Sequence, residues 1–454
     1  MIPDIDLDQP LPLLSTLSAA PTETLLSDVE ALLRSLVSAL GPAIDDPDPG
    51  SPGRPRVLPA FLLWTALLVC TLRHASSRRA IWRLLASRGL WSYPRIPVGD
   101  QAVDKRLDAA GTAPLEQLFA QLTTLLQARL SKYADTTLAP FASAVVAIDE
   151  TSLDPVARIL PSLRPLKPGD SRLLPGKLSS IFDIRLQQWR TIIHQQDPNQ
   201  NEKVAARSLL KTIEKGALIL ADLGYFGFEW FDDLTKGGYH WVSRLRETTS
   251  YTVLHRYYEK DGVFDGLIFL GAYRADRAAH AVRLVQVQVG KRRFEYITNV
   301  LDPQQLPMHE LARLYLRRWD IELGFKLVKR HLGLHLLWSG KQVGVLQQVW
   351  AVLIIAQILQ ALQVEIAGRA GVKVEEVSMA LLVEYLPQFS ARGLDGVAEF
   401  VEQGRVLGFI RPSSRTKVKA PVIEAHELVP VPEGLVLVRK ARYARRKCGP
   451  RAPV

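Results

Sequence analysis

The chain has 454 residues, and its hydrophobic content of 47% and charged content of 23% are typical of a soluble globular protein. The formal net charge of +11 makes a polyanion the first partner to consider. Cys70 and Cys448 lie far apart without metal-type spacing, which excludes a disulfide framework and indicates a reducing cytoplasm. Residues 1–10 are acidic and lack an apolar run, so we expect no signal peptide.

The first third of the chain is expected to be helical. Residues 22–40 predict an amphipathic helix, and residues 41–56 predict a linker from their Pro, Gly and Asp content. Residues 1–56 are therefore assigned to an N-terminal helix and linker, and residues 57–140 to a helical region. A solvated helical surface and a small DNA-binding module both fit this second region. Its candidate DNA-binding residues are Arg78, Arg79, Lys105 and Arg106.

Two apolar runs raise the question of membrane contact. The run at 61–72 is too short to span a bilayer, and the run at 349–364 is also short and carries three glutamines. We expect both to form buried helices.

The sequence pattern changes at residue 141. Residues 141–153, 178–189 and 190–196 predict three strands, followed by alternating helix and strand up to residue 246. This pattern predicts an α/β layer with a mixed sheet. Residues 247–300 are mostly β-like, and the chain becomes helical again after 301.

Three carboxylates stand out by their positions. Asp149 follows the apolar run AVVAI and Asp222 follows ALILA, so both lie where strands of an open sheet end and ligands bind. Glu322 lies in the helical stretch 313–332. A cluster of three carboxylates is unfavourable unless divalent cations neutralise it, as in two-metal phosphoryl transfer. Each aspartate alone is also compatible with a turn former or a helix cap.

The stretch 313–332 carries an unusual polar stripe. On one continuous helix, Tyr315, Arg318, Glu322 and Lys329 would lie within an arc of about 60°. Two cations beside a carboxylate would suit phosphate binding next to a metal site. Arg318 and Glu322 are also spaced for an ordinary surface ion pair.

Residues 315–329 fit the pattern Y-x-x-R-x-x-x-E-x-x-x-x-x-x-K at all four positions. In this they resemble the insertion-sequence-four family of DDE transposases. IDETSL at 148–153 resembles the first aspartate block of that family, and LADLGYFG at 220–227 resembles the second. NEK at 201–203 and VSRL at 242–245 are similar to further short sequences of that family.

The resemblance implies an RNase H-like mixed-sheet catalytic core at 141–246 and 301–340, with a β-rich insertion at 247–300. A mainly helical C-terminal region with a basic tail would follow at 341–454. Asp149, Asp222 and Glu322 would bind two Mg²⁺ ions, which Mn²⁺ could replace. Tyr315, Arg318 and Lys329 would hold the transposon end.

Phe294 occupies the position at which the resemblance implies an aromatic residue that stacks on a flipped base. A simple core residue on a β-strand is the alternative.

The function implied is cut-and-paste transposition in a prokaryotic cytoplasm, close to the nucleoid. The partners would be terminal inverted repeats and target DNA, bound by a homodimer. A metal-dependent nuclease without strand transfer and a non-catalytic DNA-binding regulator are the alternatives. The three intact carboxylates disfavour the regulator.

Overall fold

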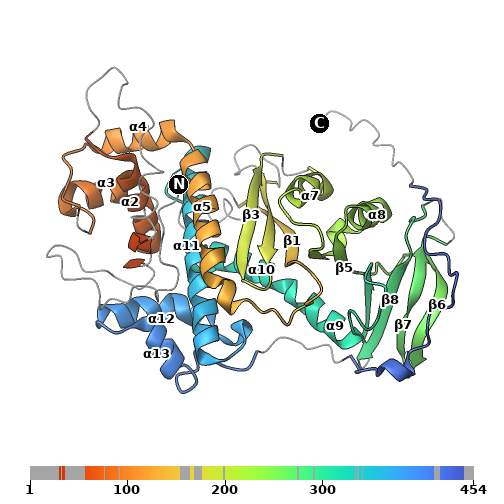
Figure 1. The fold of residues 1–454 in the computed structure, drawn as a ribbon. Coiled ribbons are helices and arrows are strands. Elements are labelled where there is room, and N and C mark those ends of the chain that lie inside the picture. The colour runs from red at the N-terminus through yellow and green to blue at the C-terminus, as the bar shows by residue number, and fades with distance from the viewer. Residues whose placement is uncertain are drawn as a thin grey trace, which may run out of the picture.

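The structure is a computed structural model, and its fold combines a helical body with a large mixed sheet (Figure 1). The residues that it describes are 30–31, 33–35, 57–75, 77–91, 93–153, 164–167, 176–197, 200–272, 276–289, 292–332, 334, 337–339, 341–413 and 420–443. The predicted helix at 22–40 lies mostly outside these residues, and the linker at 41–56 and the tail after 443 lie wholly outside them.

Within the described residues the strands form one nine-stranded sheet in the order β3-β2-β1-β4-β5-β9-β8-β7-β6. β1 pairs antiparallel with β2 and parallel with β4, and β4 pairs parallel with β5. The prediction of a mixed α/β sheet is therefore confirmed. The first five strands are β1 (Val145–Ser152), β2 (Lys177–Asp183), β3 (Gln188–Gln195), β4 (Leu218–Ala221) and β5 (His240–Arg244).

Helices cover both faces of this part of the sheet. Alternate residues of β1 enter two different hydrophobic clusters because successive side chains of a strand point to opposite faces. Val146 and Ile148 pack in the cluster that contains α7 (Glu202–Leu210) and α8 (Phe228–Lys236). Val145 and Ala147 belong to the larger cluster shared with the helical body.

The predicted β-rich insertion extends the same sheet. β9 pairs antiparallel with β5, so the four insertion strands continue the core sheet. A fully buried ion pair fixes it internally, with Arg283 Nη2 2.6 Å from Asp265 Oδ2. The strands are β6 (Tyr251–Lys260), β7 (Val263–Leu270), β8 (Val282–Val289) and β9 (Arg292–Thr298).

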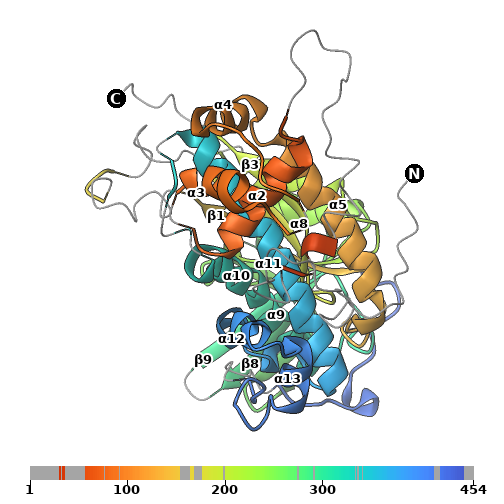
Figure 2. The same ribbon diagram turned by 90° about the vertical axis from the view of Figure 1, so that its left-hand side faces the viewer.

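The helical body joins segments that are far apart in sequence. α11 (Gln342–Ala370) packs against α2 (Ala60–Leu72) and α5 (Ala113–Leu130), so regions predicted separately at 57–140 and 341–454 share one core (Figure 2). α11 is long and apolar enough to cross a membrane, but 94% of its most apolar window is buried. Both apolar runs are thus buried helices, as predicted. The other helices are α3 (Arg79–Arg83), α4 (Asp100–Ala110), α12 (Met379–Ala391) and α13 (Gly396–Glu402).

The stretch 313–332 is not one continuous helix, which corrects the sequence prediction. α9 (Met308–Arg317) and α10 (Trp319–Lys326) meet at Arg318, and a π-helical turn follows at Leu327–His331. The N–H of Arg318 bonds to the carbonyl of Tyr315, three residues earlier, at 3.1 Å. A π-helical turn changes side-chain direction relative to an ordinary helix, so the predicted stripe does not keep its geometry.

The C-terminal region is helical only in part. Within residues 420–443 the chain is largely extended and runs along the insertion, with β-bridges from Val438 to His280 and from Arg442 to Arg277 (Figure 1). Arg439 donates to the carbonyl of Ala278 at 3.0 Å. The mainly helical prediction is therefore wrong for this segment, because its residues obtain backbone partners from residues 277–281, which connect β7 to β8.

Candidate active site

Asp149 and Asp222 become neighbours through strand pairing. β1 and β4 are adjacent and parallel, and Ile148 on β1 stands opposite Ala221 on β4. Asp222 directly follows the last residue of β4, as predicted. Asp149 is the next residue of β1 but does not end it, because β1 continues to Ser152 through its pairing with β2, which corrects the prediction for this residue. The two carboxylates therefore lie side by side at the edge of the sheet where parallel strands commonly place their ligands.

Asp149 is partly buried. Its side chain is 17% exposed, and its Oδ1 accepts the N–H of Glu150 at 2.8 Å. Burial, together with the nearby charges of Asp222 and Glu322, raises the pKa of Asp149 to about 7, against the lowering effects of that N–H and of Arg318. All three carboxylates are thus electrostatic neighbours.

Asp222 also serves a local structural purpose. Its Oδ1 accepts the N–H of Gly224 at 2.9 Å and caps the 3₁₀ turn Leu223–Tyr225. The turn-former interpretation is thus correct for this residue, and it does not compete with a ligand role, because a carboxylate has two oxygens with several acceptor positions.

Glu322 is held by an arginine of the same stretch. Arg318 Nη2 lies 2.5 Å from Glu322 Oε1, and Arg318 Nη1 lies 4.0 Å from Asp149 Oδ2. The ion pair expected from the four-residue spacing is therefore present, and its arginine also faces the first aspartate. Within the described part of the chain, no group of three Asp, Glu, His or Cys side chains is close enough to enclose a metal ion in this arrangement.

Tyr315 and Lys329 join α9 and the π-helical turn to the ends of β4 and β1. The hydroxyl of Tyr315 donates to the carbonyl of Ala221 at 3.4 Å, and burial raises its pKa to about 12. Lys329 Nζ donates to Thr151 Oγ1 at 2.6 Å and to the carbonyl of Ser152 at 2.9 Å. Both side chains therefore bond to residues that follow or precede the aspartates, where we had expected contacts to DNA alone.

A cavity of about 500 Å³ opens beside Asp222 and Arg318. It contains the half-buried Phe294 of β9, and its polar side includes Asp222 and Arg318. Sequence reasoning missed two lining residues, Arg244 and Trp319, although Arg244 lies in the VSRL text and Trp319 directly follows Arg318. The remaining lining residues are Leu223, Tyr296, Tyr315 and Leu316.

The four basic residues proposed in the N-terminal helical region fall into two groups. Arg79 and Lys105 are exposed, although Arg79 lies 3.2 Å from Asp100. Arg78 is buried and pairs with Asp108 at 2.7 Å. Arg106 donates to the carbonyl of Leu58.

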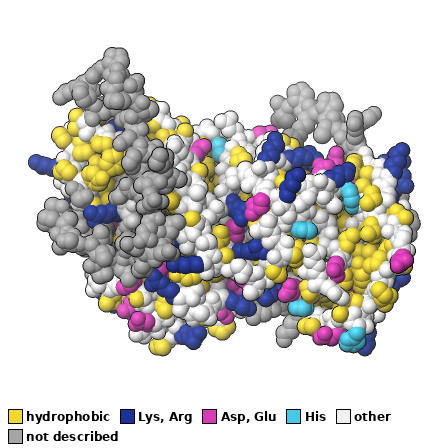
Figure 3. All heavy atoms as spheres, in the orientation of Figure 1, with side chains coloured by type: hydrophobic (Ala, Val, Ile, Leu, Met, Phe, Trp, Pro, Cys, Tyr) yellow, Lys and Arg dark blue, Asp and Glu magenta, His cyan; other side chains and the backbone are white. Residues whose placement is uncertain are grey.

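The view in Figure 3 shows Lys and Arg side chains spread over one face of the molecule with acidic ones among them. On this face, basic residues form no single uniform patch.

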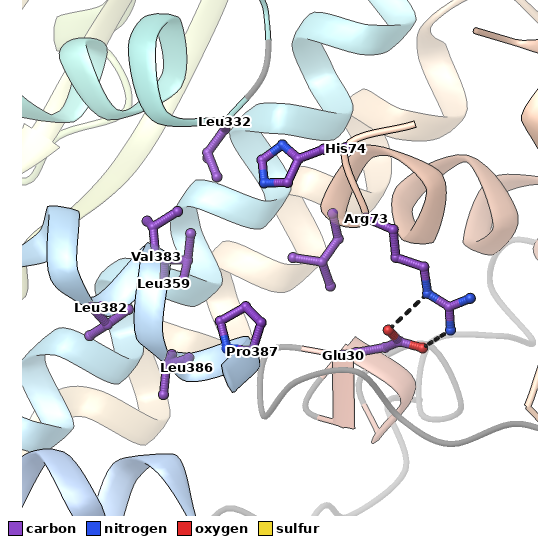
Figure 4. A pocket seen from close by; sticks show the side chains of 10 residues that line it. Glu30, Arg73, His74, Leu332, Leu359, Leu382, Val383, Leu386 and Pro387 are labelled. Atoms are coloured by element: carbon purple, nitrogen blue, oxygen red, sulfur yellow. Dashed lines mark hydrogen bonds and ion pairs between the residues drawn. The ribbon is translucent and has the colours of Figure 1, made fainter. Parts of the chain in front are cut away.

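A second cavity, of about 240 Å³, lies within the helical body. Leu359, Leu382 and Leu386 give it an apolar wall, and the ion pair between Arg73 and Glu30 borders it (Figure 4). Its lining residues do not include the three carboxylates of the candidate site.

Comparisons with known proteins point in one direction. Residues 173–358 match the family model described as "Transposase DDE domain", a span that contains Asp222 and Glu322 and begins after Asp149. The central region of this chain is similar to DDE transposases.

Two curated relatives carry transposase names. The transposase for insertion sequence element IS231E of Bacillus thuringiensis subsp. finitimus is 23% identical over 221 residues, covering 48% of this chain and 41% of the relative. Transposase InsG for insertion sequence element IS4 of Escherichia coli K12 is 25% identical over 178 residues, covering 37% and 39%. The chain therefore spans less than half the length of these relatives.

Among solved structures, a piggyBac transposase synaptic complex with hairpin DNA matches with a TM-score of 0.39 and 9% identity. That match covers 87% of this chain and 84% of the other, and its score is too low to define a shared fold. The family model and the sequence relatives thus agree that the central part of this chain is similar to transposases.

Proposed function

We propose that this chain is a cut-and-paste DNA transposase of the insertion-sequence-four type, which cuts the ends of its element and joins the freed 3′-OH to target DNA. The observation that carries the proposal is the position of Asp149 on β1 and of Asp222 just after β4, on two adjacent parallel strands, with Glu322 beside them. An RNase H-like core is supported by the antiparallel β1-β2-β3 unit followed by parallel β4 and β5.

The donor chemistry of the site fits divalent cations. Carboxylate oxygens are the ligands that Mg²⁺ and Mn²⁺ prefer, and the pKa of Asp149 is raised by burial first and then by the charges of the neighbouring carboxylates. Asp149, Asp222 and Glu322 would hold two Mg²⁺ ions, or Mn²⁺ in their place. Bound there, the ions would stabilise the attacking and leaving oxygens of a phosphoryl transfer.

Arg318 has the clearest role among the remaining residues. Its guanidinium balances charge between Glu322 and Asp149 in the free protein. A phosphate of the transposon end would offer the same planar group a bidentate partner, which releases the Glu322 carboxylate for its ligand role. Tyr315 and Lys329 would contribute by holding α9, α10 and the π-helical turn against β4 and β1, beside any contact to DNA.

Phe294 remains the proposed base-stacking residue. It lines the cavity that also contains Arg318, so a base turned out of the duplex would meet an aromatic face close to the carboxylates. The cavity volume of about 500 Å³ is in the range of ligand sites. Arg79 and Lys105 are exposed candidates for contacts to the DNA backbone. The protein would bind DNA as a homodimer in the prokaryotic cytoplasm.

The test is a strand-cutting and joining assay with purified protein, Mg²⁺ and a labelled duplex that carries the terminal repeats flanking the gene. We expect a nick that exposes a 3′-OH, followed by covalent joining to a second DNA. Cutting without joining would identify a nuclease, and specific binding without cutting would identify a regulator.

A further inference from the structure

Two further glutamates lie beside the predicted carboxylates. Glu150 follows Asp149 on β1, and Glu202 begins α7. A methyl group at Gly224 would overlap Glu202 Oε2 and would lie 3.0 Å from Asp222 Oδ1. The carboxylates of Glu202 and Asp222 therefore flank the same glycine.

The charge of Glu150 is already balanced within the protein. Lys177 Nζ lies 2.5 Å from its Oε2, and the hydroxyl of Ser179 donates to its Oε1. This glutamate thus forms an internal ion pair at the edge of the site, with its side chain only 7% exposed.

Glu202 has no comparable partner. Lys203, its neighbour in sequence, donates its Nζ to the carbonyl of Phe226 at 3.0 Å. Among the residues that the structure describes, no hydrogen bond or ion pair reaches the Glu202 carboxylate. The pKa of Glu202 is raised, by burial first and then by the charge of Asp222. A half-buried carboxylate of this kind is costly unless it meets a cation or a hydrogen-bond donor.

The Tyr225 hydroxyl is a second unpaired group near the same carboxylates. Tyr225 is 1% exposed, and its hydroxyl has no hydrogen-bond partner within the described part of the chain. Burial raises the pKa of Tyr225, and the charges of the neighbouring carboxylates raise it further. Those carboxylates are Glu150, Asp149, Glu202 and Asp222. A buried phenol without a partner among so many acceptors indicates that another species completes the hydrogen bonding.

We propose that Glu202 is a fourth carboxylate of the candidate site, which binds a hydrated divalent cation together with Asp222 while the Tyr225 hydroxyl donates a hydrogen bond within the same site. Mg²⁺ is usually held by one or two carboxylates and keeps several waters, so this pair is sufficient. The role of Asp222 as a cation ligand rests on the proposed function, whereas binding of the cation needs neither cutting nor joining of DNA.

The experiment is a titration of the full chain with Mn²⁺ in the absence of DNA, followed by electron paramagnetic resonance of the free ion. We compare the wild type with Glu202→Gln, Glu202→Asp and Tyr225→Phe, which keeps the ring packing against Trp230. Glu116→Gln is the matched control, because Glu116 is an exposed glutamate in the first turn of α5. Circular dichroism and thermal melting report whether each variant is folded.

We expect Glu202→Gln to weaken Mn²⁺ binding by about tenfold or more and Tyr225→Phe to weaken it less, as for changes around a metal ligand. Glu202→Asp should restore part of the affinity, and Glu116→Gln should bind like the wild type. Unchanged binding by folded Glu202→Gln would overturn the inference, and so would a wild type without saturable binding at millimolar Mn²⁺. Either of these results would leave the proposed cutting and joining of DNA untouched. If the wild type instead binds Mn²⁺ through Glu202 but does not cut DNA, only the proposed function is overturned.

Discussion

Arg318 is paired with Glu322 across one turn, with Nη2 2.5 Å from Oε1, so the signature arginine neutralises the signature glutamate in the free protein. The same guanidinium lies 4.0 Å from Asp149. A phosphate of the DNA would compete with the carboxylates of Glu322 and Asp149 for the Arg318 guanidinium. In the proposed function, Arg318 would therefore couple DNA binding to assembly of the carboxylates.

Substitution of Arg318 should impair cutting more than folding. Arg318→Ala is expected to slow strand cutting by about 100-fold, the loss typical of one charge-stabilising donor, with little change in melting temperature. Arg317→Ala is the matched control, because Arg317 is buried against Asp320 at 2.7 Å and its loss should cost roughly 3–5 kcal/mol of stability. Normal cutting per folded molecule by Arg318→Ala would contradict the coupling.

Asp149 should make stability depend on pH in metal-free buffer. Its folded pKa of about 7 lies above its ordinary value of 3.8, so the folded state loses stability from this group as the pH rises between those values. Asp149→Asn should therefore be more stable than the wild type at pH 8, by a few kcal/mol at most, since one pKa unit equals about 1.4 kcal/mol. The gain should vanish below pH 4. Chemical denaturation with a chelator present measures it, and a gain that is the same at both pH values would refute the assignment.

The buried pair between Asp265 and Arg283 should be essential for the insertion. Both side chains are at most 1% exposed, so Asp265→Asn leaves an unpaired buried guanidinium and should cost roughly 3–5 kcal/mol. The exposed pair between Arg256 and Glu259 offers the control, because Glu259→Gln should cost less than about 1 kcal/mol. Urea unfolding of both variants measures the difference, and equal losses would contradict the buried-pair argument.

Two truncations should separate folding from DNA binding at the C-terminus. Tyr443 donates to the buried Asp232 Oδ2 at 2.6 Å, so removal of 436–454 should lower the melting temperature. Removal of 444–454 keeps that hydrogen bond and deletes four basic residues. The slope of log K for DNA binding against log salt concentration should become less steep by roughly 0.9 for each phosphate that the tail neutralises in the full chain. An unchanged slope would show that the tail does not bind phosphate.

Hydrophobic patterns in the sequence predicted the helices and strands that depend mainly on neighbouring residues in the chain. The runs before Asp149 and Asp222 predicted buried strands, and the change from apolar to acidic marked the end of β4. It did not mark the end of β1, because pairing with β2 extends that strand to Ser152. Hydrophobic periodicity alone did not reveal the helix interruption at Arg318, because the chain there keeps helical dihedrals and changes only its hydrogen-bond partner. No Pro or Gly marks the position.

Contacts between distant segments escaped sequence reasoning. Arg78 was a candidate for phosphate binding by composition, yet it pairs with Asp108 across the helical body. The extended C-terminal segment depends on β-bridges to the insertion, and no local sequence pattern predicts these bridges. Glu202 was noticed only as part of a short resemblance. Its proximity to Asp222 arises from the packing of α7 near the turn that follows β4.

The central claim is that the three carboxylates form one catalytic site for DNA strand cutting. Its most direct test is the cutting of a labelled terminal-repeat duplex in Mg²⁺ by Asp149→Asn, Asp222→Asn and Glu322→Gln, beside the control Glu116→Gln on α5. Each of the three should lose cutting by at least about a thousandfold while it still binds the duplex, because each removes a proposed metal ligand. The control should cut normally. Cutting at the wild-type rate by any one of the three folded variants would contradict the account.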